Sequence, residues 1–279
     1  MTNPPAKIPV VVVRSFRKAR SAAGPLLRGF VGVAVLLLAG EVIGRAGLVD
    51  RSYLPPTSTV LAHAGRLLTD GGFLRDIAFT LGGWSAGLLI ASAIAVPAGV
   101  LLGSLPVVDS AARVLVEFLR PIPAVALVPL VLLVVSDQGE MERLLAAYAA
   151  TWPILINTIY GAGAVDPLAR DMARCFGLSR PAILMWVWLP SVAPFVATGV
   201  RLASSVALIV TISTELISGG GGAGLGQFVF DASGDPGGAA QVFAAVLVIG
   251  ALGLLLDTGL RYGERTAFRW HFERLGEPA

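Results

Sequence analysis

The chain alternates between long apolar runs and short polar segments. Apolar residues dominate at about 29–49, 76–103, 124–135, 144–164, 188–217 and 239–260. A helix needs about 20 such residues to cross the hydrocarbon core of a bilayer. All of these runs except 124–135 are that long, and this one is short unless the segment before it joins it. The pattern predicts an all-α integral membrane protein with about six transmembrane helices.

The composition agrees with several membrane spans. Hydrophobic residues make up 55% of the chain and charged residues 14%, against about 45–50% and about 25% in ordinary soluble domains. The formal net charge is only +3, so no large basic surface for nucleic acid is expected. The single cysteine, Cys175, excludes an internal disulfide and a cysteine-cluster metal site, and we expect it to be a small packing residue.

No residue pattern indicates catalysis. A phosphate-binding loop needs a glycine directly before its lysine, and neither Lys7 nor Lys18 has one. The glycine-rich run 219–226 contains no lysine, so we interpret it as a flexible or re-entrant loop. His63 and His271 lie at opposite ends of the chain without a metal-binding spacing. The sequence therefore predicts neither an enzyme nor a bound cofactor or metal ion.

The first apolar run follows a basic segment. Residues 1–28 hold six Lys or Arg and no acidic residue, which is also typical of a secretory signal. The length of both parts favours an uncleaved first span instead. Glu41 and Arg45 lie four residues apart on one helical face and can neutralise each other. Either a snorkelling pair near the outer surface or a role in transport fits this spacing.

Glycine and proline patterns predict close packing and one broken helix. Two glycine pairs with small-xxx-small spacing, Gly83 with Gly87 and Gly99 with Gly103, permit close helix approach in lipid. Prolines at 121, 123 and 129 predict that the third span is bent or interrupted. Transporters often bind substrate at broken helices, but a packing kink is equally compatible. In the fourth run, we expect the polar residues Asn157 and Thr158 to form interhelical hydrogen bonds.

The run 188–217 carries a polar stripe. At 100° per residue, Arg201, Ser204, Thr211 and Glu215 fall within about 80° of one another, so this face must meet protein or water. Arg201 lies about 18 Å along the helix from Leu189, near the middle of a core about 30 Å thick. Two interpretations remain open, namely an arginine that favours anionic cargo and a structural arginine bonded to neighbouring carbonyls.

The placement of positive charge predicts the orientation. Six spans put both termini on one side, together with the segments around Asp109 and Asp171. That side holds fifteen Lys or Arg, against four on the other. Positive residues are enriched in cytoplasmic loops. We therefore expect a basic cytoplasmic tail at 1–28, a transmembrane domain at 29–260 with a cytoplasmic loop at 166–190, and a basic cytoplasmic tail at 261–279.

The cytoplasmic loop carries a spaced pattern. Asp171-Met172-Ala173, three residues, Gly177, nine residues and then Val187-Trp188-Leu189-Pro190 resemble the EAA-x3-G-x9-I-x-L-P loop of permease subunits of ATP-binding-cassette (ABC) importers. Asp171 stands where that family usually has Glu, and Met172 where it usually has Ala. In the family this loop forms a short coupling helix that docks into a cytoplasmic ATPase.

Further segments resemble the nitrate, sulfonate and taurine branch of the same family. The stretch 119–133 is similar to its LRPIPxxAWIPLxxLW pattern, 153–167 to its PIxxNTxxGxxxVD stretch, and 198–203 to its TGxRLA segment. Glu215 followed by Gly224-Leu225-Gly226 also resembles the family, whose fifth span ends in a Glu before a GLG turn. The resemblance runs from Glu41 to Gly226 and implies the type I ABC importer permease fold.

The resemblance also implies site residues. The residues expected to couple to the ATPase are Arg170, Asp171, Ala173, Arg174, Gly177, Leu189 and Pro190. Those expected to line the translocation pathway are Arg201, Ser204, Thr211, Glu215, Pro123 and Asn157.

The partners implied are a second copy of the chain, two cytoplasmic ATPase subunits that hold ATP and Mg, and an extracytoplasmic binding protein, all at a bacterial inner membrane. The expected cargo is a small anion such as nitrate, taurine, another sulfonate or an aromatic acid. The alternative cargo is a vitamin or its precursor, such as riboflavin or a thiamine pyrimidine. An ATP-independent secondary transporter and a membrane scaffold without cargo are the rival functions.

Overall fold

The computed structural model describes residues 23–46, 50, 53–104, 114, 116–218 and 222–269. Within these ranges the regular elements are all helical, which confirms the predicted all-α class. In chain order they are α1 Ala23–Ala46, α2 Thr57–Leu67, α3 Gly71–Ser104, η1 Ala124–Leu127, α5 Val128–Leu132, α6 Gln138–Gly163, α7 Pro167–Cys175, α8 Arg180–Ile183, η2 Leu184–Trp188, α9 Leu189–Ser218, α10 Leu225–Gly234 and α11 Ala239–Ala267.

Among the described residues, four stretches are long and apolar enough to cross a membrane. They are α3, α6, Arg180–Ser218 and α11, and they correspond to the second, fourth, fifth and sixth predicted spans. The 24-residue helix α1 covers most of the first predicted span but is not among the four. Residues 47–49 of that span lie outside the described residues. The predicted number of six is therefore not confirmed.

Helices α3 and α6 run parallel and pack through the predicted glycines. A Cβ atom built on Gly87, Gly99 or Gly103 would come within 2.6, 2.6 and 2.5 Å of Ala146, Thr158 and Ala162, respectively. Each α6 partner lies 59 residues after its glycine, so both helices advance in the same direction. The predicted close packing by these glycines is confirmed.

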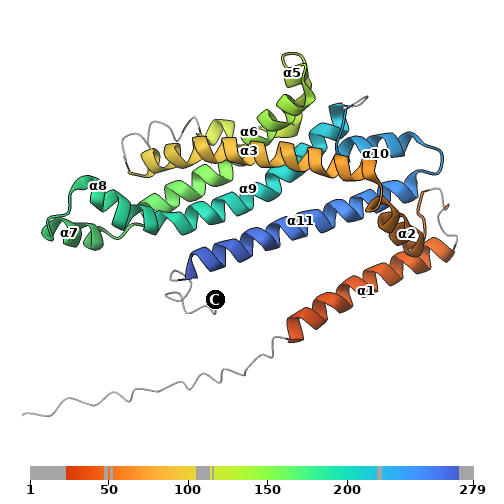
Figure 1. The fold of residues 1–279 in the computed structure, drawn as a ribbon, viewed down its shortest axis with the longest axis horizontal. Coiled ribbons are helices and arrows are strands. Elements are labelled where there is room, and N and C mark those ends of the chain that lie inside the picture. Colours follow the sequence, from red (N-terminus) through yellow and green to blue (C-terminus); the bar gives the residue numbers. More distant parts are fainter. Residues whose placement is uncertain are drawn as a thin grey trace, which may run out of the picture.

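Because α3 and α6 are parallel, the chain between them must return to the end where α3 began. Residues 124–132 of this return form only a 3-10 turn and the five-residue helix α5, with Pro123 directly before the turn. Five residues rise only about 8 Å, so α5 does not span a membrane by itself, and residues 105–113 of the segment that could join it lie outside the described residues. The predicted interruption is confirmed, because proline removes a backbone donor and disfavours helix before it. Figure 1 shows α5 projecting from the bundle.

Helix α9 packs antiparallel to α6 and completes the central group. Gly161 of α6 faces Phe195, whereas the earlier Ile154 faces the later Gly199. Small side chains fill the centre of this three-helix contact, and the fully buried ones are Ala91, Ala95, Ala146, Ala150, Ala203 and Ala207. Such residues let backbones approach closely in lipid, where dispersion between packed atoms drives helix association.

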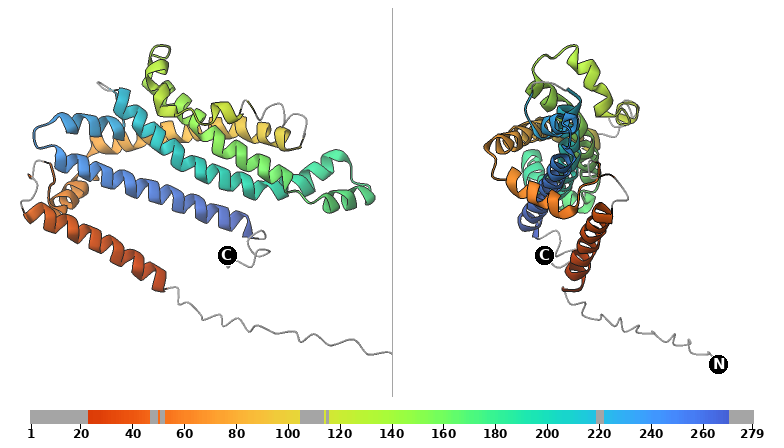
Figure 2. Two further views of the ribbon diagram at one scale, coloured as in Figure 1. Left: turned by 180° about the vertical axis from the view of Figure 1, so that it is seen from behind. Right: turned by 90° about the vertical axis from the view of Figure 1, so that its right-hand side faces the viewer.

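Helix α1 lies to one side of the central group, as both views of Figure 2 show. Its predicted ion pair is confirmed, since Arg45 Nε lies 2.6 Å from Glu41 Oε1. Glu41 also accepts hydrogen bonds from the backbone N–H and the hydroxyl of Ser58, at 2.8 and 2.9 Å. The carboxylate therefore attaches α1 to the first turn of α2.

Candidate functional site

Helix α7 is the short charged helix expected in the loop 166–190. Asp166 is its N-cap, and its carboxylate accepts a hydrogen bond of 2.9 Å from Leu168 N–H. Gly177 follows the helix with a φ of +79°, a conformation that glycine adopts without steric cost. The Leu178 N–H then bonds to Ala173 O at 3.1 Å. These contacts satisfy groups that helix ends otherwise leave unpaired.

One face of α7 is apolar and exposed. Leu168, Met172 and Phe176 lie four residues apart on the same face and are 65%, 52% and 79% exposed. At this spacing the three side chains form a continuous stripe. We call these three residues the α7 stripe. Figure 1 shows α7 and α8 together at one end of the bundle, beyond the junction of α6 and α9.

Five of the seven predicted coupling residues lie on α7 or directly after it, and Leu189 and Pro190 begin α9. Asp171 and Arg174 are exposed and form an ion pair of 3.3 Å, whereas Ala173 is buried. The Nε atom of Arg170 is buried without a hydrogen-bond partner among the described residues. The remaining coupling residues are the exposed Gly177, Leu189 and Pro190.

A π-helical turn, Leu184–Trp188, connects α8 to α9, and Pro190 is the second residue of α9. A proline ring clashes with the carbonyl four residues earlier and removes a donor, and such wide turns accommodate this local break in a helix.

The polar stripe of α9 does face protein. Ser204, Thr211 and Glu215 are buried, and Trp84 of α3 donates to the Ser204 carbonyl at 3.0 Å. Arg201 instead faces α11, where its Nε lies 2.9 Å from Glu264 Oε2 and its NH1 lies 3.6 Å from Asp257 Oδ1. Its charge is thus balanced by carboxylates, not by the carbonyls that sequence reasoning considered.

Glu215 attaches α9 to the glycine turn before α10. Its two carboxylate oxygens accept hydrogen bonds of 2.7 Å from Thr80 Oγ1 and 2.7 Å from Gly226 N–H. Thr80 in turn accepts a bond of 2.9 Å from Leu225 N–H. Gly224, with a φ of +114°, lies so close to the Glu215 carboxylate that a Cβ atom there would overlap it. We call Thr80, Glu215 and Gly224 to Gly226 the α10 junction.

The other predicted pathway residues lie apart from this junction. Pro123 is exposed before η1. Asn157 donates to Pro153 O at 2.8 Å, and Thr158 donates to Ile154 O at 2.7 Å. Both bonds lie within α6, so the prediction that these two residues form interhelical hydrogen bonds was wrong. A carbonyl four residues earlier on the same helix is the nearest acceptor for such a side chain.

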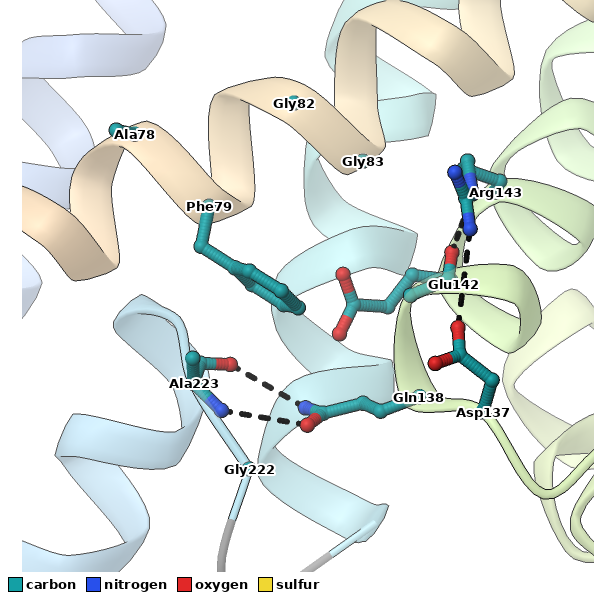
Figure 3. Close-up of a pocket in the computed structure, with 11 residues that line it drawn as sticks. Ala78, Phe79, Gly82, Gly83, Asp137, Gln138, Glu142, Arg143, Gly222 and Ala223 are labelled. Atoms are coloured by element: carbon teal, nitrogen blue, oxygen red, sulfur yellow. Dashed lines mark hydrogen bonds and ion pairs between the residues drawn. The ribbon is translucent and has the colours of Figure 1, made fainter.

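A cavity of about 760 Å³ lies between the first half of α3, the start of α6 and the loop before α10. Figure 3 shows the Phe79 ring and the Glu142 carboxylate both directed into it, with Arg143 and Asp137 at one side. Glu142 is fully buried, and neither of its oxygens has a hydrogen-bond partner among the described residues. Sequence reasoning did not single out Glu142, although a carboxylate in an apolar run was a signal that could have found it.

Within the described residues, no group of three or more His, Cys, Asp or Glu is placed to hold a metal ion. His271 and residues 219–221 of the glycine-rich run lie outside the described residues. The arrangement combines long apolar helices, an interrupted segment and, at one end, a short charged helix with an exposed apolar face. The four long apolar stretches define the class of an integral membrane protein.

Comparison with known proteins identifies the family. Residues 95–268 match the family of binding-protein-dependent transport system inner membrane components, and the chain belongs to this family. It is therefore a membrane-spanning permease subunit of an ABC importer, as the resemblance predicted. The family excludes the two rival functions, a secondary transporter and a scaffold.

Several curated relatives match most of the chain. The bicarbonate transport system permease protein CmpB of Synechocystis is 29% identical over 87% of this chain and 89% of its own length. The taurine transport system permease protein TauC of Escherichia coli is 28% identical over 86% of this chain and 88% of its own length. The nitrate import permease protein NrtB of Synechocystis is 27% identical over 86% of this chain and 88% of its own length.

Proposed function

We infer that this permease moves a small inorganic or organic anion into the cell by alternating access. The relatives CmpB, TauC and NrtB are named for bicarbonate, taurine and nitrate transport, and these names favour an anion over a vitamin. In the proposed assembly, two copies of this chain bind two cytoplasmic ATPase subunits, which hold ATP and Mg. An extracytoplasmic protein delivers the anion.

The α7 stripe carries the coupling part of this proposal. Exposed apolar side chains in a row usually mark an interaction surface, and an apolar helix face fits a groove on a partner. The polar residues Asp171 and Arg174 flank the stripe and are exposed. We expect the ATPase to cover Leu168, Met172 and Phe176, and to draw the two α7 helices together when ATP closes it.

The double variant Met172→Ser and Phe176→Ser tests this docking. We expect ATP-dependent uptake in proteoliposomes with the partner ATPase and binding protein to fall at least about tenfold, because truncating central apolar anchors commonly costs 2 kcal/mol or more. The melting temperature of the isolated permease should change little, since both side chains are exposed. Ala169→Ser is the control, because Ala169 is exposed on the same helix outside the stripe.

Normal uptake and normal ATPase binding by the double variant would contradict the proposed docking surface. If the Ala169→Ser control also lost uptake, any added hydroxyl on α7 would be harmful. The loss would then not be specific to the α7 stripe, and this would contradict the stripe as the docking surface.

The orientation is also a proposal. The described basic residues of the α7 end are Arg170, Arg174 and Arg180, and a cytoplasmic position for them follows the positive-inside tendency. Accessibility of Cys175 to a membrane-impermeant thiol reagent measures it, because this single cysteine is exposed on α7. Labelling in intact cells would contradict a cytoplasmic α7.

The polar residues of α9 are proposed to border the pathway, with Pro123 and Asn157. Among these residues we test Arg201, because its ion pairs with Glu264 and Asp257 connect α9 to α11. We expect Arg201→Ala to lower anion-stimulated ATPase activity more than basal activity. Arg261→Ala is the control, since Arg261 binds the same Asp257 at 3.0 Å but is exposed on α11. An unchanged ratio of stimulated to basal activity in folded Arg201→Ala protein would contradict a role in the pathway.

A further inference from the structure

The cavity beside Glu142 carries an inference separate from anion transport. Burying an ionised carboxylate is costly unless it is paired or hydrogen-bonded, and most buried polar atoms in proteins have a partner. Glu142 has none among the described residues, although it is fully buried. Its carboxylate therefore offers two free acceptors to whatever occupies the cavity.

The neighbouring groups are already engaged with one another. The Gln138 amide lies near Glu142 but donates to Ala223 O at 3.2 Å and accepts from Ala223 N–H at 3.3 Å. Arg143 donates from Nε to Gly139 O at 2.8 Å, and its NH2 lies 3.7 Å from Asp137 Oδ1. The hydrogen bonds and the ion pair of these two side chains go to those partners, although both lie close enough to act on the Glu142 carboxyl group.

The charge around the cavity selects a positive ligand. The titratable residues that line it are Asp137, Glu142 and Arg143, so two potential negative charges face one positive charge. Glu215 acts on Glu142 from α9 and adds a further carboxylate. A cation that entered the cavity would offset this crowding of carboxyl groups, whereas an anion would add to it.

Size and donor chemistry favour an organic cation over a bare metal ion. A cavity of 760 Å³ lies within the range of about 300–1,000 Å³ for small-molecule pockets. A metal ion such as Ca²⁺ needs about six to eight oxygen ligands, whereas the carboxylates among the described lining residues are only those of Asp137 and Glu142. An ammonium group needs fewer acceptors, and aromatic faces such as that of Phe79 attract cations.

We propose that this cavity binds a small organic ammonium compound, with the Glu142 carboxylate as its charged acceptor and Phe79 against its carbon chain. The cavity is distinct from the α7 stripe, and its ligand has the opposite charge to the proposed cargo. In the proposed orientation α6 begins at the extracytoplasmic side, so the ligand would enter from there. It would occupy the contact between α3, α6 and the loop that leads to α10.

Three probes with the same three-carbon chain test the charge requirement. The purified permease is titrated with propylammonium chloride, 1-propanol and sodium propionate at matched ionic strength, with calorimetry and the melting temperature as readouts. Only propylammonium should bind saturably and raise the melting temperature, since binding to the folded state stabilises it. An equal response to 1-propanol would overturn the proposal, because binding would then not depend on charge. The absence of any response to propylammonium would also overturn it, and is the result expected if Glu142 is protonated or only hydrated.

Matched variants locate the site. Glu142→Gln keeps the side-chain shape but removes the charge, and should weaken propylammonium binding at least about tenfold through loss of charge-assisted hydrogen bonds. Glu140→Gln is the control, because Glu140 is exposed on the same helix outside the cavity. Unchanged binding by Glu142→Gln would overturn the proposal.

Phe79→Ala provides a second variant in case Glu142→Gln does not fold. Phe79 lines the cavity and its ring is directed into it (Figure 3), so this change removes the aromatic face and leaves Glu142 in place. Propylammonium binding should weaken in this variant, and unchanged binding would contradict the assigned cavity. The ATPase takes no part in these measurements, so their failure would leave the proposed anion transport untouched.

Discussion

Helix α7 and the α10 junction use the same local chemistry at very different depths. Each short helix has a carboxylate at its N-terminus and a glycine with positive φ at one end, Gly177 at +79° and Gly224 at +114°. Asp166 is exposed and caps its own helix, whereas Glu215 is buried and reaches α10 from α9. The contrast shows that a cap in solvent defines one helix, while a buried cap connects several elements.

The difference in depth also separates the functions of the two regions. The α10 junction ties α3, α9 and α10 together through Thr80 and Glu215, so a change there should affect the whole bundle. Helix α7 directs the α7 stripe outward and has few partners within the chain. A change on that stripe should affect an interaction with another protein and leave the bundle intact.

The largest effect is expected from Gly226→Ala. A Cβ atom at Gly226 would overlap the carbonyl oxygen of Ile212 and approach the Glu215 side chain. Overpacking commonly costs about 1–3 kcal/mol, and more where the obstacle cannot move. We expect the melting temperature and the yield of monodisperse protein to fall sharply, as measured by thermal unfolding and size-exclusion chromatography.

Gly250→Ala is the matched control for that variant, because a Cβ atom there meets nothing within 4 Å on α11. It should leave stability unchanged or raise it slightly, since alanine restricts the unfolded chain. A Gly226→Ala protein as stable as this control would refute the close contact between α9 and α10.

A smaller loss is expected from Glu215→Gln. The glutamine amide keeps one oxygen acceptor, but its NH2 group replaces the second acceptor and faces either Thr80 or the Gly226 N–H. A buried donor left without an acceptor costs about 1–3 kcal/mol. Thr80→Val removes the hydroxyl that bridges Glu215 and Leu225. In a double-mutant cycle on thermal stability, the two changes should be non-additive because they share one network. Additive losses would indicate that the two side chains act independently.

The smallest effect on stability is expected from Asp166→Ala, the exposed counterpart. Loss of an N-cap typically costs about 1 kcal/mol, and here it should loosen only α7. Hydrogen exchange should therefore increase in 167–175 and stay unchanged in α3 and α9. Asp171→Ala on the same helix removes an exposed ion pair and should change exchange less, because such pairs contribute little. Faster hydrogen exchange throughout the bundle of the Asp166→Ala protein would contradict the claim that this cap stabilises only α7.

Local patterns predicted much of this architecture correctly. Helix α7 was predicted from the spaced pattern that resembles the ABC importer permeases, and its capping bonds are local because they join residues only two to five positions apart. The glycine pairs of α3 were predicted to pack closely, since their four-residue spacing places them on one helical face. The prolines at 121, 123 and 129 correctly predicted an interruption at 124–135, where the structure has only a 3-10 turn and α5, whereas the expected interhelical hydrogen bonds of Asn157 and Thr158 were not found.

The sequence by itself determined the apolar spans, the α7 helix, the paired Glu41 and Arg45, and the shared face of Arg201, Ser204, Thr211 and Glu215, because each depends on residues that are neighbours in one helix. Only the tertiary structure decided which groups meet that face: Glu264 at Arg201, and Thr80 with Gly226 at Glu215. It also left the Glu142 carboxyl group buried without a hydrogen-bond partner in the part of the chain that the structure describes. Helical periodicity states which way a side chain points, but its partner comes from a distant part of the chain that packing brings alongside.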